Sequence, residues 1–431
     1  MTQSKHGASS QALSDMKILW VVNTIFPDAA IHLGMEPSVF GGWMYGLARD
    51  LVNSEDVDLA VATIFPGAEF QSFSVNGIRY YLIPQQCGNA KLKDSWLKII
   101  SDFTPDLVHI HGTEFGHGMV LMNACSSLKY VVSIQGLVSV CHRYFLAGLS
   151  VWDVLGNITF RDVVRWNTLF HAKHDFYKRG QVEQEYIRRA NAVIGRTDWD
   201  RAHALAINPK VSYHFCNESL RDEFYCGEKW SLGSCRHHSI FLSQAAYPIK
   251  GMHQVLKAVA LLKDSYPDIL VEVAGYDITN AATLKSRLKR SGYGRYIASM
   301  IRQYGLEKHV KFLGPLRADE MKKAYLRSNI FVCPSSIENS PNSLGEAQIL
   351  GVPCIAAYCG GVPSMVENGK GAVLYQFDEY EMLSFIINKV FSEIKFAVCL
   401  SENGAAEAAV RHNRLNNLFN LKKVYSEFLD D

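Results

Sequence analysis

Two glutamates, Glu338 and Glu346, are the residues whose types and spacing are best suited to chemistry. Glu338 follows an apolar run at residues 330–333, and Glu346 lies on a helix predicted to begin at Ser343. Ser343 stands three residues before Glu346, which is the spacing of a capping box. Because a helix N-terminus offers amides to an anion, this stretch could meet phosphate with amides and hydroxyl groups with carboxylates. That combination suits a sugar joined to a nucleotide; the alternatives are a purely local cap at Glu346 and a solvated Glu338.

Lys250 is the next candidate for a site. It precedes Gly251 at the junction between a loop, residues 244–251, and a predicted helix that begins at about Met252. A lysine at such a junction is well placed to meet a diphosphate, because its ammonium group and the helix amides point at the same anion. A solvated charge at the start of the helix is the alternative.

The order of these segments resembles the donor-binding signature of family-4 retaining glycosyltransferases, the glycosyl transferases group 1. The resemblance rests on two glutamates separated by seven residues, then a helix and the strings GVPCIAA and GGVPSMVENG, and it covers nearly the whole chain. It implies an α/β protein of the GT-B fold, with two Rossmann-like doubly wound parallel-sheet domains facing across a cleft. It also implies transfer of a sugar, with retention of configuration, from a UDP-, GDP- or ADP-linked donor. A glycan or lipid-linked acceptor in bacterial surface polysaccharide synthesis would fit.

The resemblance assigns roles to these residues. Lys250 would contact the donor diphosphate, Glu346 would hold the ribose hydroxyls, and Glu338 would hold sugar hydroxyls or stabilise positive charge at the anomeric carbon. We expect no cofactor and no metal, because no DxD motif ends a strand and Lys250 with the amides near Ser343 and Gly361 would meet the phosphate charge. The other donor-binding candidates are Ser340, Asn342, Ser343 and Leu344, and the turn glycines Gly275 and Gly314 beside the nucleobase.

The N-terminal half alternates apolar runs with helical patterns, which predicts a doubly wound parallel sheet. Ligands of such sheets bind at the carboxyl ends of the strands, and side-chain alternation points His109 and His111 the same way. Gln135 stands where many relatives of the resembling family have a histidine, so it can bind a hydroxyl but cannot titrate. The candidates on this acceptor side are Gly41, Gly42, His109, His111, Gln135 and Arg196. Histidines that contact helices, a tight turn at the glycines and a structural ion pair of Arg196 are the alternatives.

Composition describes an ordinary globular protein of 431 residues with a formal net charge of +2, which argues against a nucleic-acid binder. Residues 1–15 lack an apolar core and are expected to be a disordered lead-in, and no apolar run is long enough to span a membrane. Ten scattered cysteines without metal-ligand spacing favour the cytoplasm. We expect an N-terminal domain at 16–220, a linker at 221–236, a C-terminal domain at 237–400, and a helix at 401–431 crossing back.

Residues 138–190 form an expected helical insertion rich in aromatic and basic side chains. Such a composition suits an acceptor site or peripheral contact with the inner face of a membrane. Interspersed acidic residues favour the simpler interpretation, a helical insertion that packs on the first domain. Two further functions stay open: a nucleotide-sugar epimerase, and a catalytically silent sugar-nucleotide-binding paralogue, which Gln135 and the absence of a cation at 244–246 would suit.

Overall fold

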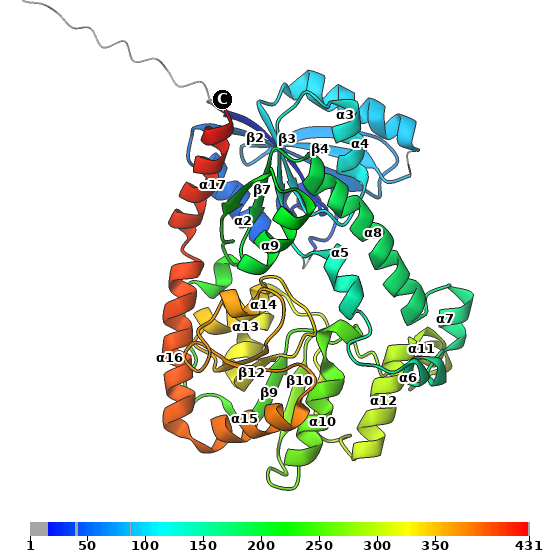
Figure 1. Ribbon diagram of the computed structural model, residues 1–431, viewed down its shortest axis with the longest axis vertical. Coiled ribbons are helices and arrows are strands. Elements are labelled where there is room, and N and C mark those ends of the chain that lie inside the picture. The colour runs from blue at the N-terminus through cyan, green and yellow to red at the C-terminus, as the bar shows by residue number, and fades with distance from the viewer. Residues whose placement is uncertain (1–15, 39–41, 87, 430–431) are drawn as a thin grey trace, which may run out of the picture.

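The computed structural model describes residues 16–38, 42–86 and 88–429, which form two α/β domains stacked along the long axis of the molecule (Figure 1). The expected disordered lead-in, 1–15, and Gly41 lie outside the described residues. Every apolar run that the sequence interpretation assigned to a strand forms a strand. The prediction of two doubly wound, mostly parallel sheets is therefore confirmed.

The N-terminal domain is built on an eight-stranded sheet in the order β3-β4-β2-β1-β5-β6-β7-β8. Only β3 runs antiparallel, and it joins β4 through Asn76 and Gly77, whose positive φ angles of 51° and 78° fit the predicted hairpin turn. The loop expected before residue 41 contains a short helix, α1 (Pro27–His32). The strands are β1 (Met16–Val21), β2 (Val57–Phe65), β3 (Gln71–Val75), β4 (Ile78–Pro84), β5 (Leu107–His111), β6 (Tyr130–Ser133), β7 (Ala192–Gly195) and β8 (Ser212–Phe215). The helices around them are α2 (Gly42–Val52), α3 (Asn89–Phe103), α4 (His117–Ala124) and α9 (Asp198–Ile207).

The C-terminal domain has a six-stranded parallel sheet in the order β11-β10-β9-β12-β13-β14. Its central strands are buried along their length, as strands covered by helices on both faces must be. The strands are β9 (Arg236–Leu242), β10 (Leu270–Val273), β11 (Val310–Phe312), β12 (Ser328–Cys333), β13 (Cys354–Ala357) and β14 (Val373–Tyr375). The main helices are α10 (Met252–Leu262), α12 (Gly292–Tyr304), α13 (Ala318–Arg327), α14 (Asn342–Ile349) and α15 (Tyr380–Ser392).

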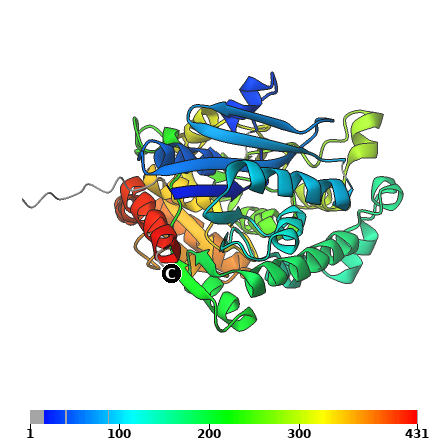
Figure 2. The same ribbon diagram turned by 90° about the horizontal axis from the view of Figure 1, so that it is seen from above.

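The helical insertion does not pack on the first domain alone, so that interpretation is wrong in part. Its long helix, α8 (Leu169–Arg189), and its first helix, α5 (Val138–Cys141), pack on the N-terminal domain. Between them, α6 (Val151–Gly156) and α7 (Phe160–Val164) reach the C-terminal domain, where Val154 joins the core beside α12. The apolar side chain of Val154 explains this placement, because it is buried only against the second domain. Figure 2 shows the insertion on the opposite side of the molecule from the C-terminal end.

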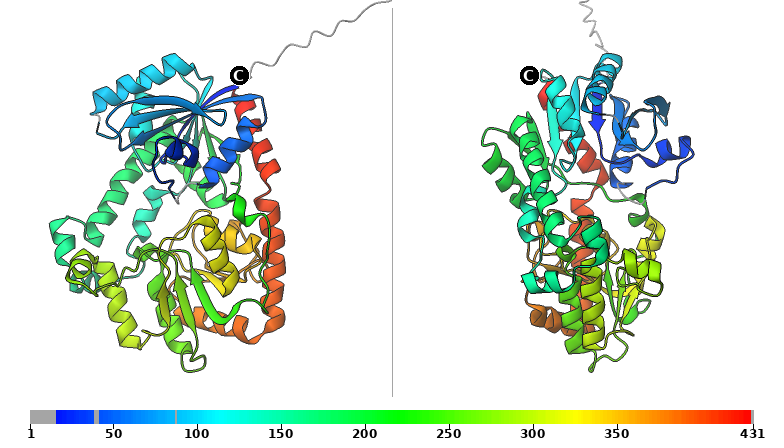
Figure 3. Two further views of the ribbon diagram at one scale, coloured as in Figure 1. Left: turned by 180° about the vertical axis from the view of Figure 1, so that it is seen from behind. Right: turned by 90° about the vertical axis from the view of Figure 1, so that its right-hand side faces the viewer.

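The chain ends in two helices rather than the single helix predicted at 401–431. α16 (Ile394–Arg411) lies along the C-terminal domain, and α17 (Arg414–Leu429) packs on the N-terminal domain, so the pair spans both (Figure 3). Tyr425 of α17 accepts a hydrogen bond of 2.9 Å from Nε1 of Trp20 in β1. Within the part of the chain that the structure describes, no helix combines the length and the apolar character that crossing a bilayer requires.

Candidate active site

Lys250 and Glu338, 88 residues apart in the chain, are in direct contact. The Lys250 Nζ lies 2.5 Å from Oε1 of Glu338, which also accepts a hydrogen bond of 2.8 Å from Ser335 Oγ. Lys250 ends a short 3-10 turn before α10, and Glu338 lies in the loop that follows β12. The structure therefore brings the two residues with predicted catalytic roles together as an ion pair.

A glycine makes this contact feasible. Gly251 adopts a φ of +70° directly before α10, and a Cβ there would lie 1.7 Å from the carbonyl oxygen of Pro334. The two loops thus touch backbone to backbone, and the amide of Ser336 donates to the carbonyl of Ile249 at 2.8 Å. Any side chain at position 251 would push Lys250 away from Glu338.

The Lys250–Glu338 pair is charged and partly open to solvent. About a fifth of each side chain is exposed, 22% for Lys250 and 17% for Glu338. Burial opposes the positive charge of Lys250, but the adjacent Glu338 carboxylate outweighs it and raises the lysine pKa. A small apolar cluster of Phe145, Ile249 and Ile337 packs beside the pair and brings the insertion against this loop. The ammonium group is therefore fixed by Glu338, while part of the Lys250 side chain stays open to solvent.

The double glycine, Gly360–Gly361, packs against the backbone of the loop that carries Glu338. Gly360 has a φ of +50°, and a Cβ on it would lie 2.0 Å from the Glu338 carbonyl oxygen. The amide of Gly361 donates to that same carbonyl at 2.9 Å. The Gly361 amide itself therefore already has a partner within the protein, and phosphate binding by the amides near Gly361 stays a prediction.

The predicted capping box at Ser343 and Glu346 is also wrong. α14 begins at Asn342, with Pro341 at its N-cap and no side-chain cap, so Ser343 already lies in the first turn. Glu346 Oε1 instead accepts one hydrogen bond of 2.9 Å from Nε of Arg221 and forms an ion pair with Nη2 of the same guanidinium at 2.8 Å. Burial raises the pKa of Glu346, and the charge and hydrogen bond of Arg221 act against that rise.

Arg221 is a site residue that the sequence interpretation missed. It lies in the predicted linker, a segment without periodicity, and nothing in its neighbours marks it as a partner of Glu346. It also faces Gly42: a Cβ on Gly42 would lie 3.4 Å from the Arg221 side chain. Gly42 and Arg221 line one cavity of about 550 Å³ together with Tyr45 and Arg49 of α2 and with Arg317, which precedes α13. This cavity lies between the two domains, and Arg221 connects its lining to Glu346.

The two strand-end histidines do not face this cavity. His109 is fully buried, and its ring nitrogens lie 2.6 Å from Tyr425 Oη and 2.7 Å from Ser133 Oγ. The His111 ring packs at a tilt against His109 and Trp20, with ring centroids 3.8 Å and 4.2 Å apart. Burial lowers the pKa of His111 to about 3, so it stays neutral. Both histidines point the same way, as alternation predicted, but toward the C-terminal helix α17.

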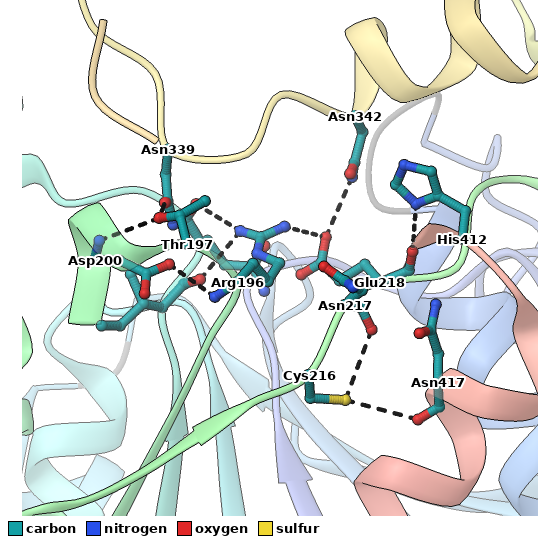
Figure 4. Close-up of polar contacts among 12 residues, drawn as sticks. Arg196, Thr197, Asp200, Cys216, Asn217, Glu218, Asn339, Asn342, His412 and Asn417 are labelled. Carbon is teal, nitrogen blue, oxygen red and sulfur yellow. Dashed lines mark hydrogen bonds and ion pairs between the residues drawn. The ribbon is translucent and has the colours of Figure 1, made fainter. Parts of the chain in front are cut away.

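Arg196 is the centre of a polar network that joins the two domains (Figure 4). Its guanidinium forms a buried ion pair with Glu218 and donates to the carbonyls of Ile134 at 3.1 Å and Gln135 at 2.8 Å. Glu218 in turn accepts a hydrogen bond of 3.3 Å from Asn342 of the C-terminal domain. The alternative interpretation of Arg196, a structural ion pair, describes this arrangement.

Next to this network, Thr197 Oγ1 donates to Oδ1 of Asn339 at 2.7 Å, the residue directly after Glu338. Asn342, which bonds Glu218, begins α14, the helix that carries Glu346. The interdomain network therefore fixes both ends of the loop that holds the predicted donor-binding residues.

Comparison with known proteins agrees with this geometry. Residues 237–407 match the family described as Glycosyl transferases group 1. The matched residues make up most of the C-terminal domain. It is 25% identical over 306 residues to a protein of Corynebacterium urealyticum named D-inositol 3-phosphate glycosyltransferase, covering 66% of this chain and 70% of that protein.

Solved structures confirm the GT-B fold. Sucrose-phosphate synthase from Thermosynechococcus elongatus superposes with a TM-score of 0.70 at 15% identity, over 96% of this chain and 99% of that one. HepE of Anabaena, in complex with UDP and glucose, superposes with a TM-score of 0.66 at 17% identity, over 95% of this chain and 99% of that one. At these identities the likeness concerns the fold alone.

The remaining donor-side candidates occupy different environments. Leu344 is fully buried in the domain core, and its amide donates to the Pro341 carbonyl at 3.0 Å. Ser340 is buried as well, with 8% of its surface exposed. The carbonyl of Ser343 accepts from Tyr325 Oη at 3.0 Å. Gly275 and Gly314 pair across the ends of β10 and β11, with the Gly275 amide 2.8 Å from the Gly314 carbonyl and open space where either Cβ would stand. Of this set, the two glycines best fit a position beside a flat base.

Cysteine and metal-ligand side chains add no further group to this site. Cys333 and Cys354 are buried free thiols, as their apolar surroundings predicted. Across residues 16–38, 42–86 and 88–429, no three histidine, cysteine, aspartate or glutamate side chains are grouped so that they could hold a metal ion. Metal independence stays a prediction that needs an activity measurement.

Proposed function

We propose that this protein is a retaining glycosyltransferase that moves a sugar from a nucleotide-diphosphate donor to a glycan or lipid-linked acceptor, in bacterial surface polysaccharide synthesis. The observation that carries the proposal is the Lys250–Glu338 pair, held by close backbone contacts at the start of α10. A fixed, charged ammonium group beside a helix N-terminus suits a leaving diphosphate.

In the proposed reaction, Lys250 neutralises the charge that develops on the leaving diphosphate. Glu338 keeps Lys250 protonated and lies where it can accept sugar hydroxyls or stabilise positive charge at the anomeric carbon. The acceptor attacks from the side that the diphosphate leaves, and the departing phosphate oxygen takes the acceptor proton. This route needs no protein nucleophile, which fits a site whose carboxylate is already paired with a lysine.

Glu346 is the proposed partner of the ribose hydroxyls. A carboxylate offers about four lone-pair sites, so it can accept from ribose hydroxyls as well as from Arg221. We propose that Arg221 orients this carboxylate and holds it ionised against its burial. The cavity of about 550 Å³ beside Arg221 offers the space for the nucleoside.

The base is best tested with UDP first, because a protein of the same fold, HepE of Anabaena, was solved with UDP and with UDP-glucose. We would measure thermal shifts of the purified chain with UDP, GDP, ADP and CMP, and with the matching monophosphates of the first three. We expect one base to be preferred and its diphosphate to give a larger shift than its monophosphate. No shift with any nucleotide, and none with its sugar conjugates, would contradict the proposed donor site.

Two variants separate the proposed roles. Lys250→Ala should remove the difference between diphosphate and monophosphate, with Lys257→Ala on the following helix, α10, as the control. Glu346→Ala should weaken donor binding by about tenfold, roughly 1.4 kcal/mol, because a hydrogen-bonded ligand hydroxyl loses its acceptor. Unchanged donor affinity in Glu346→Ala would rule out the ribose role.

Nucleotide release then distinguishes the activities. A transferase releases the nucleoside diphosphate faster when acceptor is present, an epimerase converts the sugar while the nucleotide stays attached, and a silent paralogue binds without release. Release that persists in EDTA is the outcome expected for the proposed metal-independent reaction.

A further inference from the structure

An exposed apolar surface lies where the insertion meets the C-terminal domain. We call residues 151–166 together with residues 284–290 the cap; it comprises α6, α7 and the short helix α11 (Leu284–Lys289). Its most exposed large apolar side chains are Trp152 at 80%, Trp166 at 76%, Leu284 at 74% and Phe160 at 72%. Five further apolar side chains on the same elements are exposed to a smaller extent: Val151, Leu155, Val163, Val164 and Leu288. Large apolar side chains gathered this densely on a protein surface usually mark an interaction site.

The cap is an ordered part of the fold. Ser150 and Thr159 begin α6 and α7 with capping boxes, in which Asp153 and Asp162 accept from the cap backbone. Thr159 Oγ1 donates to the carbonyl of Arg290 at 3.1 Å, which ties the insertion to the C-terminal domain. In Figure 1 the labels α6, α7 and α11 stand together at one edge of the molecule, on the side away from α16 and α17.

Spacing places several of these side chains on one helix face. Phe160, Val163 and Val164 stand at positions i, i+3 and i+4 of α7, and Leu284 and Leu288 at i and i+4 of α11. All five are half exposed or more. Each helix therefore exposes to solvent an apolar stripe of the kind that usually packs against a protein core.

The cap is also strongly basic along its second segment. Residues 284–290 contain four basic side chains and no Asp or Glu, namely Lys285, Arg287, Lys289 and Arg290, and the neighbouring α12 adds Arg295 and Arg302. Burial and then the like charges of Arg295, Arg302 and Arg287 lower the pKa of Arg290, which shows how closely these cations are crowded. On the first segment Arg165 is exposed, while Asp162 is buried in its cap. The positive charge of the cap is thus carried on the surface.

We propose that the cap docks on an anionic lipid bilayer, with its aromatic and aliphatic side chains in the headgroup region and its Lys and Arg side chains on lipid phosphates. Exposed Trp and Phe beside Lys and Arg are the composition that binds at a membrane interface. A second copy of the chain is disfavoured, because a two-fold contact would set basic surfaces opposite each other. A soluble acidic glycan would meet the charges but would leave the Val and Leu side chains without an apolar partner.

The position of the cap gives this docking a consequence for the whole molecule. Because α6 and α7 belong to the insertion and α11 to the C-terminal domain, one membrane contact would hold segments of both halves. This inference does not depend on the proposed sugar transfer, since vesicle binding is measured without donor or acceptor. A lipid-linked acceptor would nevertheless be brought close to the protein by the same contact.

The test is co-sedimentation of the full chain with vesicles. One set would be phosphatidylcholine alone and the other equal parts of phosphatidylcholine and phosphatidylglycerol, each at low and at physiological ionic strength. We expect binding to the anionic vesicles that weakens with salt. The double variants Trp152→Ser with Phe160→Ser and Lys285→Glu with Lys289→Glu should each lower the partition coefficient at least about tenfold.

Phe419→Ser is the matched control, because Phe419 is a similarly exposed aromatic residue (68%) on α17. It should bind anionic vesicles like the unmodified chain. Variants that keep the unmodified thermal midpoint but bind undiminished would overturn the proposal. So would an unmodified chain that binds no anionic vesicle, or one that binds a soluble acidic polysaccharide and not vesicles.

A second readout covers the case in which a Ser variant unfolds. Lipids brominated on their acyl chains should quench the tryptophan fluorescence of the unmodified chain on anionic vesicles. The variant Trp152→Phe with Trp166→Phe keeps the apolar character of the cap, so it should still sediment with vesicles but lose most of that quenching. Quenching that is unchanged in this variant would place the contact elsewhere and overturn the proposal.

Discussion

Polar residues near strand ends differ in burial between the two domains. In the N-terminal domain, His109 and Arg196 are buried and have their partners inside the protein, Tyr425 and Ser133 for the histidine and Glu218 for the arginine. In the C-terminal domain, Lys250 and Glu338 pair with each other and keep about a fifth of their surface open to solvent. Residues near the carboxyl ends of parallel strands, or in the loops that follow them, thus serve cohesion in one domain and are available for chemistry in the other.

The difference follows from what covers each sheet edge. α17 lies over β1 and β5 of the N-terminal sheet and supplies the Tyr425 hydroxyl that bonds both Trp20 and His109. The loop from Cys216 onward returns Glu218 to Arg196. Loss of a buried N-terminal partner should therefore act on stability, whereas changes at the C-terminal pair should act on activity.

The largest effect expected from this comparison is that of Arg196→Met. The change leaves Glu218 buried without its cation, which costs about 3–5 kcal/mol of unfolding free energy. Urea denaturation of the variant measures this loss, and Arg201→Met, an exposed arginine on the next helix, is the control expected to change stability by about 0.5 kcal/mol or less.

A double variant sharpens that prediction. Arg196→Met combined with Glu218→Leu removes both charges, so a substantial part of the lost stability should return. If Arg196→Met were as stable as the unmodified chain, the ion pair would not hold the domains, and Arg196 would again be a candidate for contact with a ligand.

Tyr425→Phe should have the next largest effect. Without the hydroxyl, the indole N–H of Trp20 and one ring nitrogen of His109 lose their shared buried partner, at a cost of about 2 kcal/mol. Denaturation measures the loss, and Tyr177→Phe, an exposed residue of α8, is the control. Nucleotides should still raise the thermal midpoint of Tyr425→Phe. If the variant kept full stability but lost these shifts, His109 would be a residue of the ligand site and not one that stabilises the fold.

The sequence alone was enough for the fold and for the donor-side segment. Apolar runs of four to nine residues predicted the strands, because strands buried on both faces need such runs. The glycines at 251 and 360–361 marked the loops whose backbones touch. These signals are local. The resemblance to glycosyltransferases rested on the order in which the segments follow one another along the chain.

What the sequence could not supply was long-range pairing. Arg221 bonds Glu346 across 125 residues, and Tyr425 bonds His109 across 316. Neither partner has a periodic or motif context that would reveal it. The helix start at Asn342 was missed by one residue, which was enough to turn Glu346 from a predicted capping residue into the partner of an arginine.

Glu338→Gln should have the smallest effect on stability and the clearest effect on activity. The amide keeps the shape of the side chain but removes the charge that raises the pKa of Lys250. Because the pair is partly exposed, the unfolding free energy should change by no more than about 1 kcal/mol. Turnover should nevertheless fall at least about tenfold, roughly 1.4 kcal/mol of transition-state stabilisation. Denaturation and nucleotide release measure the two quantities, and Glu367→Gln, at an exposed pair with Lys370, is the matched control. A variant that lost stability and kept its turnover would place Glu338 with Arg196 among the residues that hold the molecule together.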